Sequence, residues 1–404
     1  MVIVRRPLLL RSAAMAIVAA GLVACAPAGE RGPGGAGTPT RSPSTTPAAP
    51  LTETPTPTPT PTPTQASPTE QALELVTAMT PRERAATVVM GHAPGIDPSA
   101  LVSALHAGPQ GLILMGDNIA ADPEQQRALI DAVSAATDPA PLIGIDQEGG
   151  DVARLPWDDA PSARELKGAD PAEVADAFAA RARQLDEAGI TVNFGIVADL
   201  PRDDASFIFS RAYGTDPEEV AGAVGGAVDG EQGRVLSTLK HFPGHGAAEG
   251  DSHSSIPTTE MPLDEWRSAD AVPFEAGIDA GAELVMMGHL RFTAVDERPA
   301  SLSPEWYRVL REDLGFDGVA VTDDLGMLLS SGDPTYEDAA GNAVEALRAG
   351  ADLVLMIAGS TPESQAATVD RIAAAARNGE LPEGRLAEAA QRVLALRLDA
   401  DPGE

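Results

Sequence analysis

The stretch that decides the fold is Leu142-Ile143-Gly144-Ile145-Asp146-Gln147-Glu148-Gly149-Gly150. It begins with a short apolar run, which is typical of a strand buried on both faces of a parallel sheet. The run ends in acidic residues and glycines, as expected where a strand opens into a loop. The rest of the chain repeats this design, so the stretch indicates one unit of a repeated architecture.

Eight such runs occur downstream of residue 70, at 87–90, 111–115, 142–145, 191–194, 237–240, 284–287, 319–322 and 353–356. Amphipathic stretches between them, among them 171–188, 217–231 and 336–349, predict helices. Eight β-then-α units predict an α/β fold, a (β/α)8 barrel of the TIM type, as a single domain over residues 71–400. A doubly wound open sheet is the alternative that this pattern leaves open.

The amino-terminal region has a different character. A basic start and the apolar run 13–24 lead to Cys25, which resembles a bacterial lipobox. We therefore predict a lipoprotein signal peptide over 1–24 and lipidation of Cys25. An ordinary secretory signal with a chance cysteine is the alternative. Residues 25–70 are rich in Pro and Thr and predict a linker without a core, either an extended spacer or an unstructured tail.

Composition limits the partners of the protein. The chain has 60 acidic and 28 basic residues and a net charge of -32, which opposes binding to nucleic acid or to an anionic membrane face. We expect membrane contact only through the lipid anchor, on the extracytoplasmic face of the cell membrane. The single cysteine rules out a disulfide within the chain.

Polar residues cluster directly after four of the apolar runs, where the carboxyl ends of barrel strands would meet. The clusters are Asp146 to Gly150, Lys240 to Gly246 with Asp251-Ser252-His253 beyond it, Gly288-His289, and Thr322-Asp323-Asp324. Four of the six histidines fall in these segments. Packing alone does not explain clusters at four strand ends, so we expect an active site there.

With these motifs the chain resembles glycoside hydrolase family 3, and within it the single-domain β-N-acetylhexosaminidases. The matching text includes Ile145 to Gly150, Lys240 to Gly246, Asp251 to His253 and Thr322 to Met327. The resemblance implies an exo-acting, retaining β-N-acetylglucosaminidase that releases terminal N-acetylglucosamine from peptidoglycan-derived glycans. It implies a carbohydrate substrate and no cofactor, and we expect a monomer.

The resemblance assigns the catalytic roles. Asp323 corresponds to the nucleophile, which attacks the anomeric carbon in retaining hydrolysis, while Asp324 should point away from the pocket. A helix N-cap is the alternative role for Asp323. His253 corresponds to the acid and base, with Asp251 stabilising the charged imidazolium and fixing its orientation. The alternative for His253 is a surface histidine beside a chance aspartate.

Five further positions match the family's sugar pocket: Asp146, Arg154, Arg211, Lys240 and His241. Surface ion pairing is the alternative for the two arginines. Glu148 and His245 are expected to support the loops. A metal site on His241, His245, Asp251 and His253 is disfavoured, because the segment lacks the helical histidine pair that zinc hydrolases use.

Two segments depart from the family pattern. No proline stands near Ile196, and the arginine motif reads Ser210-Arg211-Ala212-Tyr213 where Arg-Ser-Phe is usual. These changes bear on the shape of the pocket and so on the aglycone. Three alternative functions stay open: a β-glucosidase, a phosphorolytic glycosidase of the same fold, and a non-catalytic lipoprotein that binds wall glycan.

Overall fold

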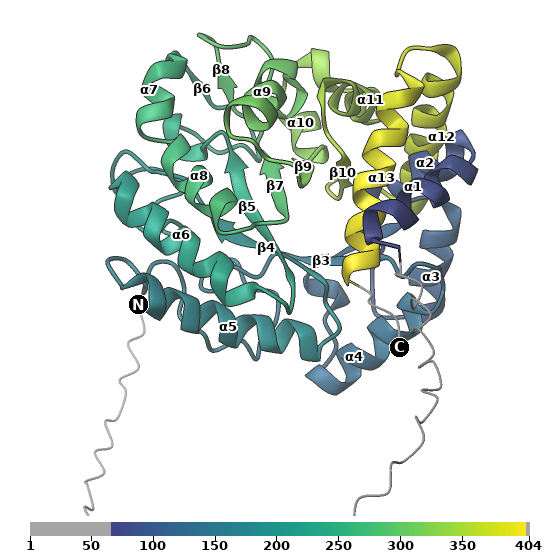
Figure 1. The fold of residues 1–404 in the computed structure, drawn as a ribbon, viewed down its shortest axis with the longest axis horizontal. Helices are drawn as coiled ribbons and strands as arrows, with labels where there is room; N and C mark the ends of the chain where they lie inside the picture. Colours follow the sequence, from purple (N-terminus) through teal and green to yellow (C-terminus); the bar gives the residue numbers. More distant parts are fainter. Residues whose placement is uncertain (1–65, 401–404) are drawn as a thin grey trace, which may run out of the picture. The chain divides into compact units, whose positions relative to one another are not determined.

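The computed structural model describes residues 66–400, so the predicted signal peptide, Cys25 and nearly all of the predicted linker lie outside it. Eight parallel strands close into a barrel in the order β1-β10-β9-β7-β5-β4-β3-β2 (Figure 1). The strands are β1 (Val89–Gly91), β2 (Gly111–Leu114), β3 (Leu142–Ile145), β4 (Val192–Val197), β5 (Leu236–Phe242), β7 (Leu284–Met287), β9 (Val319–Asp324) and β10 (Leu353–Met356). Because β1 pairs with both β2 and β10, the sheet has no free edge. The predicted (β/α)8 barrel is confirmed, and the open sheet is excluded.

Helices surround the barrel (Figure 1). They are α1 (Pro68–Ala78), α2 (Pro81–Thr87), α3 (Pro98–Ala107), α4 (Pro123–Ser134), α5 (Pro171–Glu187), α6 (Pro217–Glu231), α7 (Leu263–Ser268), α8 (Ala271–Asp279), α9 (Pro304–Arg308), α10 (Gly326–Leu329), α11 (Ala339–Ala349), α12 (Pro362–Asn378) and α13 (Glu383–Ala400). Many begin with Ser, Thr or Asp followed by Pro; at α2 and α6 the caps are Thr80 and Asp216. The cap accepts an unpaired backbone N–H, and proline needs no such partner at the first helical position.

Two apolar layers hold the barrel together. Inside the barrel, side chains from all eight strands pack into one apolar core, to which β5 contributes Leu236. The core includes Met90, Ile113, Phe194, Met286 and Leu355. A second and larger layer fills the space between the strands and the surrounding helices. Such a filled interior makes the barrel a rigid support, so its strand ends hold the loops in fixed positions.

Several boundaries differ from the predictions; β4, β5 and β9 extend two or three residues further than predicted, and two other differences have a clear local cause. The first strand begins at Val89, because Thr87 belongs to α2 and its hydroxyl donates to the carbonyl of Glu83. The helix predicted from residue 336 begins at Ala339, after a short turn over Pro334–Tyr336. None of the helices in the described part of the chain is long and apolar enough to cross a membrane.

A small parallel sheet, which the sequence did not predict, joins two of the loops. It pairs β6 (Thr258–Thr259), in the loop after β5, with β8 (Arg291–Phe292), in the loop after β7. The first of these loops also carries His253, five residues before β6. The sheet therefore ties the downstream end of the His253 loop to the neighbouring barrel unit.

Candidate active site

A cavity of about 360 Å³ opens at the carboxyl ends of the barrel strands. It is lined by seven of the eight predicted catalytic and sugar-binding residues: Asp146, Arg154, Arg211, Lys240, His241, His253 and Asp323. A larger hollow of about 900 Å³ lies at the other end, around Pro141, Thr191 and Val235 at the starts of strands. In barrels of this type the chemistry belongs to the carboxyl ends, so the smaller cavity is the candidate site.

Lys240, in β5, joins two acidic residues of the loop after β3. Its Nζ lies 3.0 Å from Oδ1 of Asp146 and 2.7 Å from Oε1 of Glu148, with only 2% of the side chain exposed. Burial raises the pKa of both carboxyls, but Lys240 together with Arg154 at Asp146 and Arg211 at Glu148 outweighs it and leaves both pKa values lowered. Burial likewise lowers the pKa of Lys240, and the two carboxylates reverse this. All three groups are therefore charged at neutral pH.

The two predicted arginines complete this cluster. Arg211 donates to Glu148 through Nε at 2.9 Å and Nη2 at 2.6 Å, a bidentate pair that fixes the guanidinium plane. Arg154 donates from Nη2 to Asp146 at 3.3 Å. Both arginines line the cavity, so surface ion pairing does not describe them. Glu148 makes its bonds to Lys240 and Arg211, which fits its predicted supporting role.

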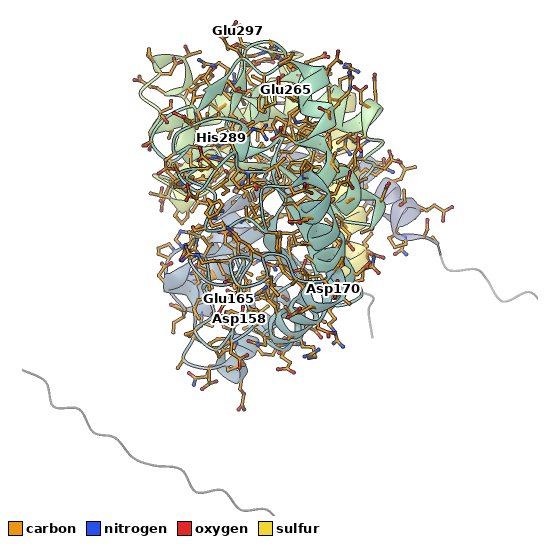
Figure 2. The ribbon with its side chains drawn as sticks, turned by 90° about the vertical axis from the view of Figure 1, so that its left-hand side faces the viewer. Asp158, Glu165, Asp170, Glu265, His289 and Glu297 are labelled. Carbon is orange, nitrogen blue, oxygen red and sulfur yellow. The ribbon has the colours of Figure 1, made fainter. Side chains whose placement is uncertain are left out.

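A buried network holds the loop that carries Arg154. The side chain of Gln147 accepts from the backbone N–H groups of Arg154 and Leu155 and donates to Asp158. Asp158 in turn accepts from Arg181 of α5 at 2.8 Å, and both side chains are almost fully buried. Asp158 lies well away from His289 of the loop after β7 (Figure 2). The network therefore anchors the β3 side of the site from outside the cavity.

Asp199, just after β4, orients the histidines of the β5 loop. Its carboxylate lies 2.7 Å from Nδ1 of His241 and also accepts from the backbone N–H groups of His241 and His245. Burial raises the pKa of Asp199, but the neighbouring His241 outweighs it, so the pKa is lowered. A Cβ at Gly246 would collide with the Leu200 carbonyl, which explains the glycine there. The loop is thus pressed against the end of β4.

The two aspartates that end β9 have different surroundings. Asp324 accepts from the backbone N–H groups of Gly326, Ile357 and Ala358, so both of its oxygens are occupied by structure. Asp323 accepts only from the backbone N–H of Asp324, at 2.8 Å, and lines the cavity. Asp324 also borders the cavity, which the prediction that it points away from the pocket did not anticipate, but its carboxylate is held by backbone N–H groups. Asp324, and not Asp323, accepts the backbone N–H of Gly326, the first residue of α10, so the helix-capping alternative does not describe Asp323. Burial raises the pKa of Asp323, but its interactions with His241 and His289, the backbone N–H of Asp324 and the charge of Lys240 together leave it lowered, which favours the ionised carboxylate.

His253 and Asp251 form a pair at the mouth of the cavity. Nδ1 of His253 lies 2.6 Å from Oδ1 of Asp251, and the same oxygen accepts from the His253 backbone N–H. Burial raises the pKa of Asp251, but these bonds to His253 outweigh it and lower the value. Nε2 of His253 is left for other partners, and 61% of the side chain is exposed. A substrate in the cavity can therefore reach it.

His245 behaves differently from its neighbours. It is 2% exposed, and its Nε2 lies 3.0 Å from the hydroxyl of Ser252, next to His253. Burial lowers the pKa of His245 to about 4, so the ring is neutral at pH 7. It joins the two ends of the β5 loop, which agrees with the predicted supporting role.

Sequence reasoning missed several residues around the cavity. Asp199 directly follows a strand, and this position could have revealed it. Ser252 and three methionines, Met115, Met286 and Met327, also line the cavity. Methionines at strand ends look like ordinary core residues, so no pattern in the sequence distinguishes them.

The candidate metal ligands lie near one another but are each engaged by a different side chain. His241 pairs with Asp199, His245 with Ser252, and His253 with Asp251. Within residues 66–400, no three His, Cys, Asp or Glu side chains are grouped to hold a metal ion. The donor set is thus arranged as separate hydrogen-bonded pairs.

Comparison with known proteins identifies the family. Residues 90–396 match the model of the glycosyl hydrolase family 3 N-terminal domain. The beta-hexosaminidase LpqI of Mycobacterium tuberculosis is 33% identical over 399 residues, which cover 95% of this chain and 96% of LpqI. A beta-hexosaminidase of Methylococcus capsulatus is 34% identical over 279 residues, covering 66% of this chain and 80% of that protein.

Solved structures agree. The structure of M. tuberculosis LpqI is 30% identical with a TM-score of 0.73, over 82% of this chain and 96% of that one. A family 3 β-N-acetylglucosaminidase from a Paenibacillus species is 32% identical with a TM-score of 0.75, over 81% of this chain. This chain spans 64% of the length of the Paenibacillus protein. The chain therefore belongs to glycosyl hydrolase family 3, and it is a glycoside hydrolase with a carbohydrate substrate.

Proposed function

We propose that the protein is an exo-acting, retaining β-N-acetylglucosaminidase that releases terminal N-acetylglucosamine from peptidoglycan-derived glycans. One observation carries this proposal: an ionised Asp323 with a free oxygen and the His253–Asp251 pair open onto the same cavity. These groups are what a two-step displacement at an anomeric carbon requires. The choice of N-acetylglucosamine as the sugar is supported by the relatives, which are named beta-hexosaminidase and β-N-acetylglucosaminidase.

In the first step Asp323 attacks the anomeric carbon and forms a covalent glycosyl-enzyme. His253 gives its proton to the departing glycosidic oxygen through Nε2, because Nδ1 is held by Asp251. Asp251 stabilises the charged imidazolium before transfer and keeps the ring oriented. The acid at the cavity mouth and the nucleophile within it thus act on opposite sides of the bond that breaks.

In the second step a water molecule replaces the leaving group. His253, now neutral, accepts the proton of that water, and the water oxygen attacks the anomeric carbon and releases Asp323. The configuration at the anomeric carbon is inverted twice and so retained. A histidine suits this double duty because its charge changes near neutral pH.

The remaining residues hold the sugar. Asp146 can accept hydrogen bonds from hydroxyl groups, while Arg154, Arg211 and Lys240 can donate them. Their mutual ion pairs fix these groups before the substrate arrives, which lowers the cost of ordering them on binding. A cavity of about 360 Å³ is small, which supports binding of a single terminal residue and hence exo action.

We also propose that the enzyme acts as a monomer held to the cell membrane, on its extracytoplasmic face, by a lipid on Cys25. The lipobox-like leader supports the anchor. Within the described residues, the exposed large apolar side chains are confined to Leu73, Leu75, Ile96 and Phe207, and this supports a monomer. Radiolabelled palmitate incorporation that disappears in Cys25→Ala would test the anchor.

Trapping of the intermediate tests the function. The protein is incubated with a fluorinated N-acetylglucosamine analogue, digested, and analysed by mass spectrometry. We expect the sugar on Asp323 alone. A label on another residue would overturn the nucleophile assignment, and absence of any label together with full activity of Asp323→Ala would overturn the mechanism.

Substrate comparisons separate the competing activities. Aryl N-acetyl-β-glucosaminide should be cleaved with a higher kcat/KM than the matching glucoside. Release of free sugar rather than sugar 1-phosphate in phosphate buffer would distinguish hydrolysis from phosphorolysis. Binding of N-acetylglucosamine without turnover of either substrate would instead favour a glycan-binding protein.

A further inference from the structure

Phe207 is an unusual residue for this chain. Aromatic residues make up only 3% of the sequence, and most of the large ones are buried. Phe207 lies in the segment between β4 and α6 with a relative exposure of 40%. Among residues 66–400 it is the one aromatic member of the exposed large apolar group. A single exposed apolar ring is common on protein surfaces, so it is the position of Phe207 beside His245 and His253, and not its exposure alone, that points to a role.

The ring of Phe207 packs against two histidines that line the cavity. Its centroid lies 6.0 Å from that of His253, at an interplanar angle of 65°, and 5.4 Å from that of His245, at 37°. The T-shaped contact with His253 covers one part of the Phe207 ring, and the 40% of the residue that is exposed leaves another part accessible to solvent. Phe207 therefore presents an apolar surface at the rim, beside the residue that we propose as the acid.

The position of the acid determines where the leaving group lies. His253 must come within hydrogen-bond reach of the glycosidic oxygen to protonate it. The group attached to that oxygen then extends from the cavity past His253, toward solvent. Phe207 is adjacent to this path because its ring touches His253. A sugar in that position has a face of C–H groups, which can pack on a flat apolar ring.

We propose that Phe207 is a specificity-determining residue that binds the leaving-group sugar, and so favours glycan substrates over glycosides of small alcohols. This inference rests on the proposed function, and in particular on His253 as the acid. A pure positioning role for Phe207 is the competing explanation. Asp251 already orients His253 through a 2.6 Å contact and a backbone hydrogen bond, so the ring is not needed for that.

Two substrates separate the explanations. N,N′-Diacetylchitobiose has a sugar leaving group, whereas methyl β-N-acetylglucosaminide has only a methyl group for the ring to contact. Both leaving groups are poorly acidic, so both need the proton from His253. We expect Phe207→Ala to lower the ratio of kcat/KM for the disaccharide to that for the methyl glycoside by about tenfold, the size of one lost aromatic contact. Phe207→Trp should leave this ratio of kcat/KM values near that of the unmodified protein, whereas Phe207→Leu should lower the ratio almost as much as Phe207→Ala.

Two controls make the outcome decisive. His253→Ala should lower kcat/KM for both substrates, which reports loss of the acid itself. Leu73→Ala removes an exposed apolar side chain on α1, outside the cavity, and should leave the ratio at its original value. Equal losses on both substrates in Phe207→Ala would overturn the inference and assign the ring to positioning. If the unmodified protein cleaved neither substrate, the proposed function would fail instead.

Discussion

At the carboxyl ends of the barrel strands, Asp146 and Glu148 are buried beside Lys240, and their pKa values are lowered. At the amino ends, where helices lead into strands, Glu231 and Glu283 are also shielded from water, and their pKa values are raised. Burial raises the pKa of Glu231 to about 8, since its main partner is the neutral side chain of Asn193 and one of its oxygens has no partner.

The difference shows what each end is built to do. Burial penalises the charged form of a carboxylate at both ends. At the carboxyl ends Lys240 and Arg211 overcome this penalty for Asp146 and Glu148, and such buried charges add little net stability. A protein keeps groups of this kind where chemistry requires them. Glu231 and Glu283 lack such partners, and no reaction depends on them. Asp352, just before β10, is the exception at this end, because it is paired with Arg311, Arg385 and Arg392.

The largest effect should come from removing the charge of the nucleophile. Asp323→Asn keeps the shape of the side chain but cannot form the glycosyl-enzyme, so kcat should fall on the order of 10⁴-fold. The rate of hydrolysis of an aryl N-acetyl-β-glucosaminide measures this. Thermal unfolding should show a folded variant. A loss of less than tenfold would mean that Asp323 is not the reacting carboxylate.

Breaking the charge balance should cost stability next. Lys240→Met removes the cation shared by Asp146 and Glu148 and leaves excess negative charge buried. We expect the free energy of unfolding to fall by about 3–5 kcal/mol, measured by urea denaturation at pH 7. The loss should shrink at acidic pH, where the two carboxyls take up protons. A loss that is the same at all pH values would instead indicate a packing defect.

The stability contributed by Glu231, at the amino ends of the strands, should depend on pH in the opposite direction to that of the Lys240 cluster. The folded pKa of Glu231, about 8, lies above its ordinary value of 4.5, so the folded state holds the proton more tightly. This group therefore contributes stability fully below about pH 4.5, and that contribution is lost as pH rises toward 8.

Glu231→Gln removes this titration and keeps a neutral side chain of similar shape. Relative to the unmodified protein, the variant should gain about 3 kcal/mol in unfolding free energy between pH 5 and pH 8. Urea denaturation at both pH values measures the gain. If the difference in unfolding free energy between the two proteins were the same at pH 5 and pH 8, Glu231 would be ionised in the folded protein at both pH values.

An exposed ion pair should give the smallest effect. Arg82 and Asp370 lie 2.8 Å apart, but their side chains are 46% and 64% exposed. Water screens them, so Arg82→Ala should change the unfolding free energy by less than about 1 kcal/mol. This variant is the control for Lys240→Met. If Arg82→Ala and Lys240→Met lowered the unfolding free energy equally, burial would not explain the greater cost expected for removing Lys240.

Periodicity and spacing were enough to predict the barrel. Continuous apolar runs such as Leu142–Ile145 are typical of strands buried on both faces, and eight of them with helices between predict a barrel. The open sheet was excluded only by the structure, in which β1 pairs with both β2 and β10. The sequence did not predict β6 and β8, because two-residue strands carry no periodic signal. Their pairing depends on where the barrel brings the two loops.

The candidate site divides in the same way. The sequence by itself determined which residues stand at strand ends, since Asp146, Lys240 and Asp323 follow directly from the apolar runs. Only the tertiary structure decided which groups meet: Asp199 with His241, Glu148 with Lys240, and Phe207 with His253. The physical reason is range. Residues within one element obey local periodicity, whereas these contacts join positions 42 to 92 residues apart and arise only when the strands close into a barrel.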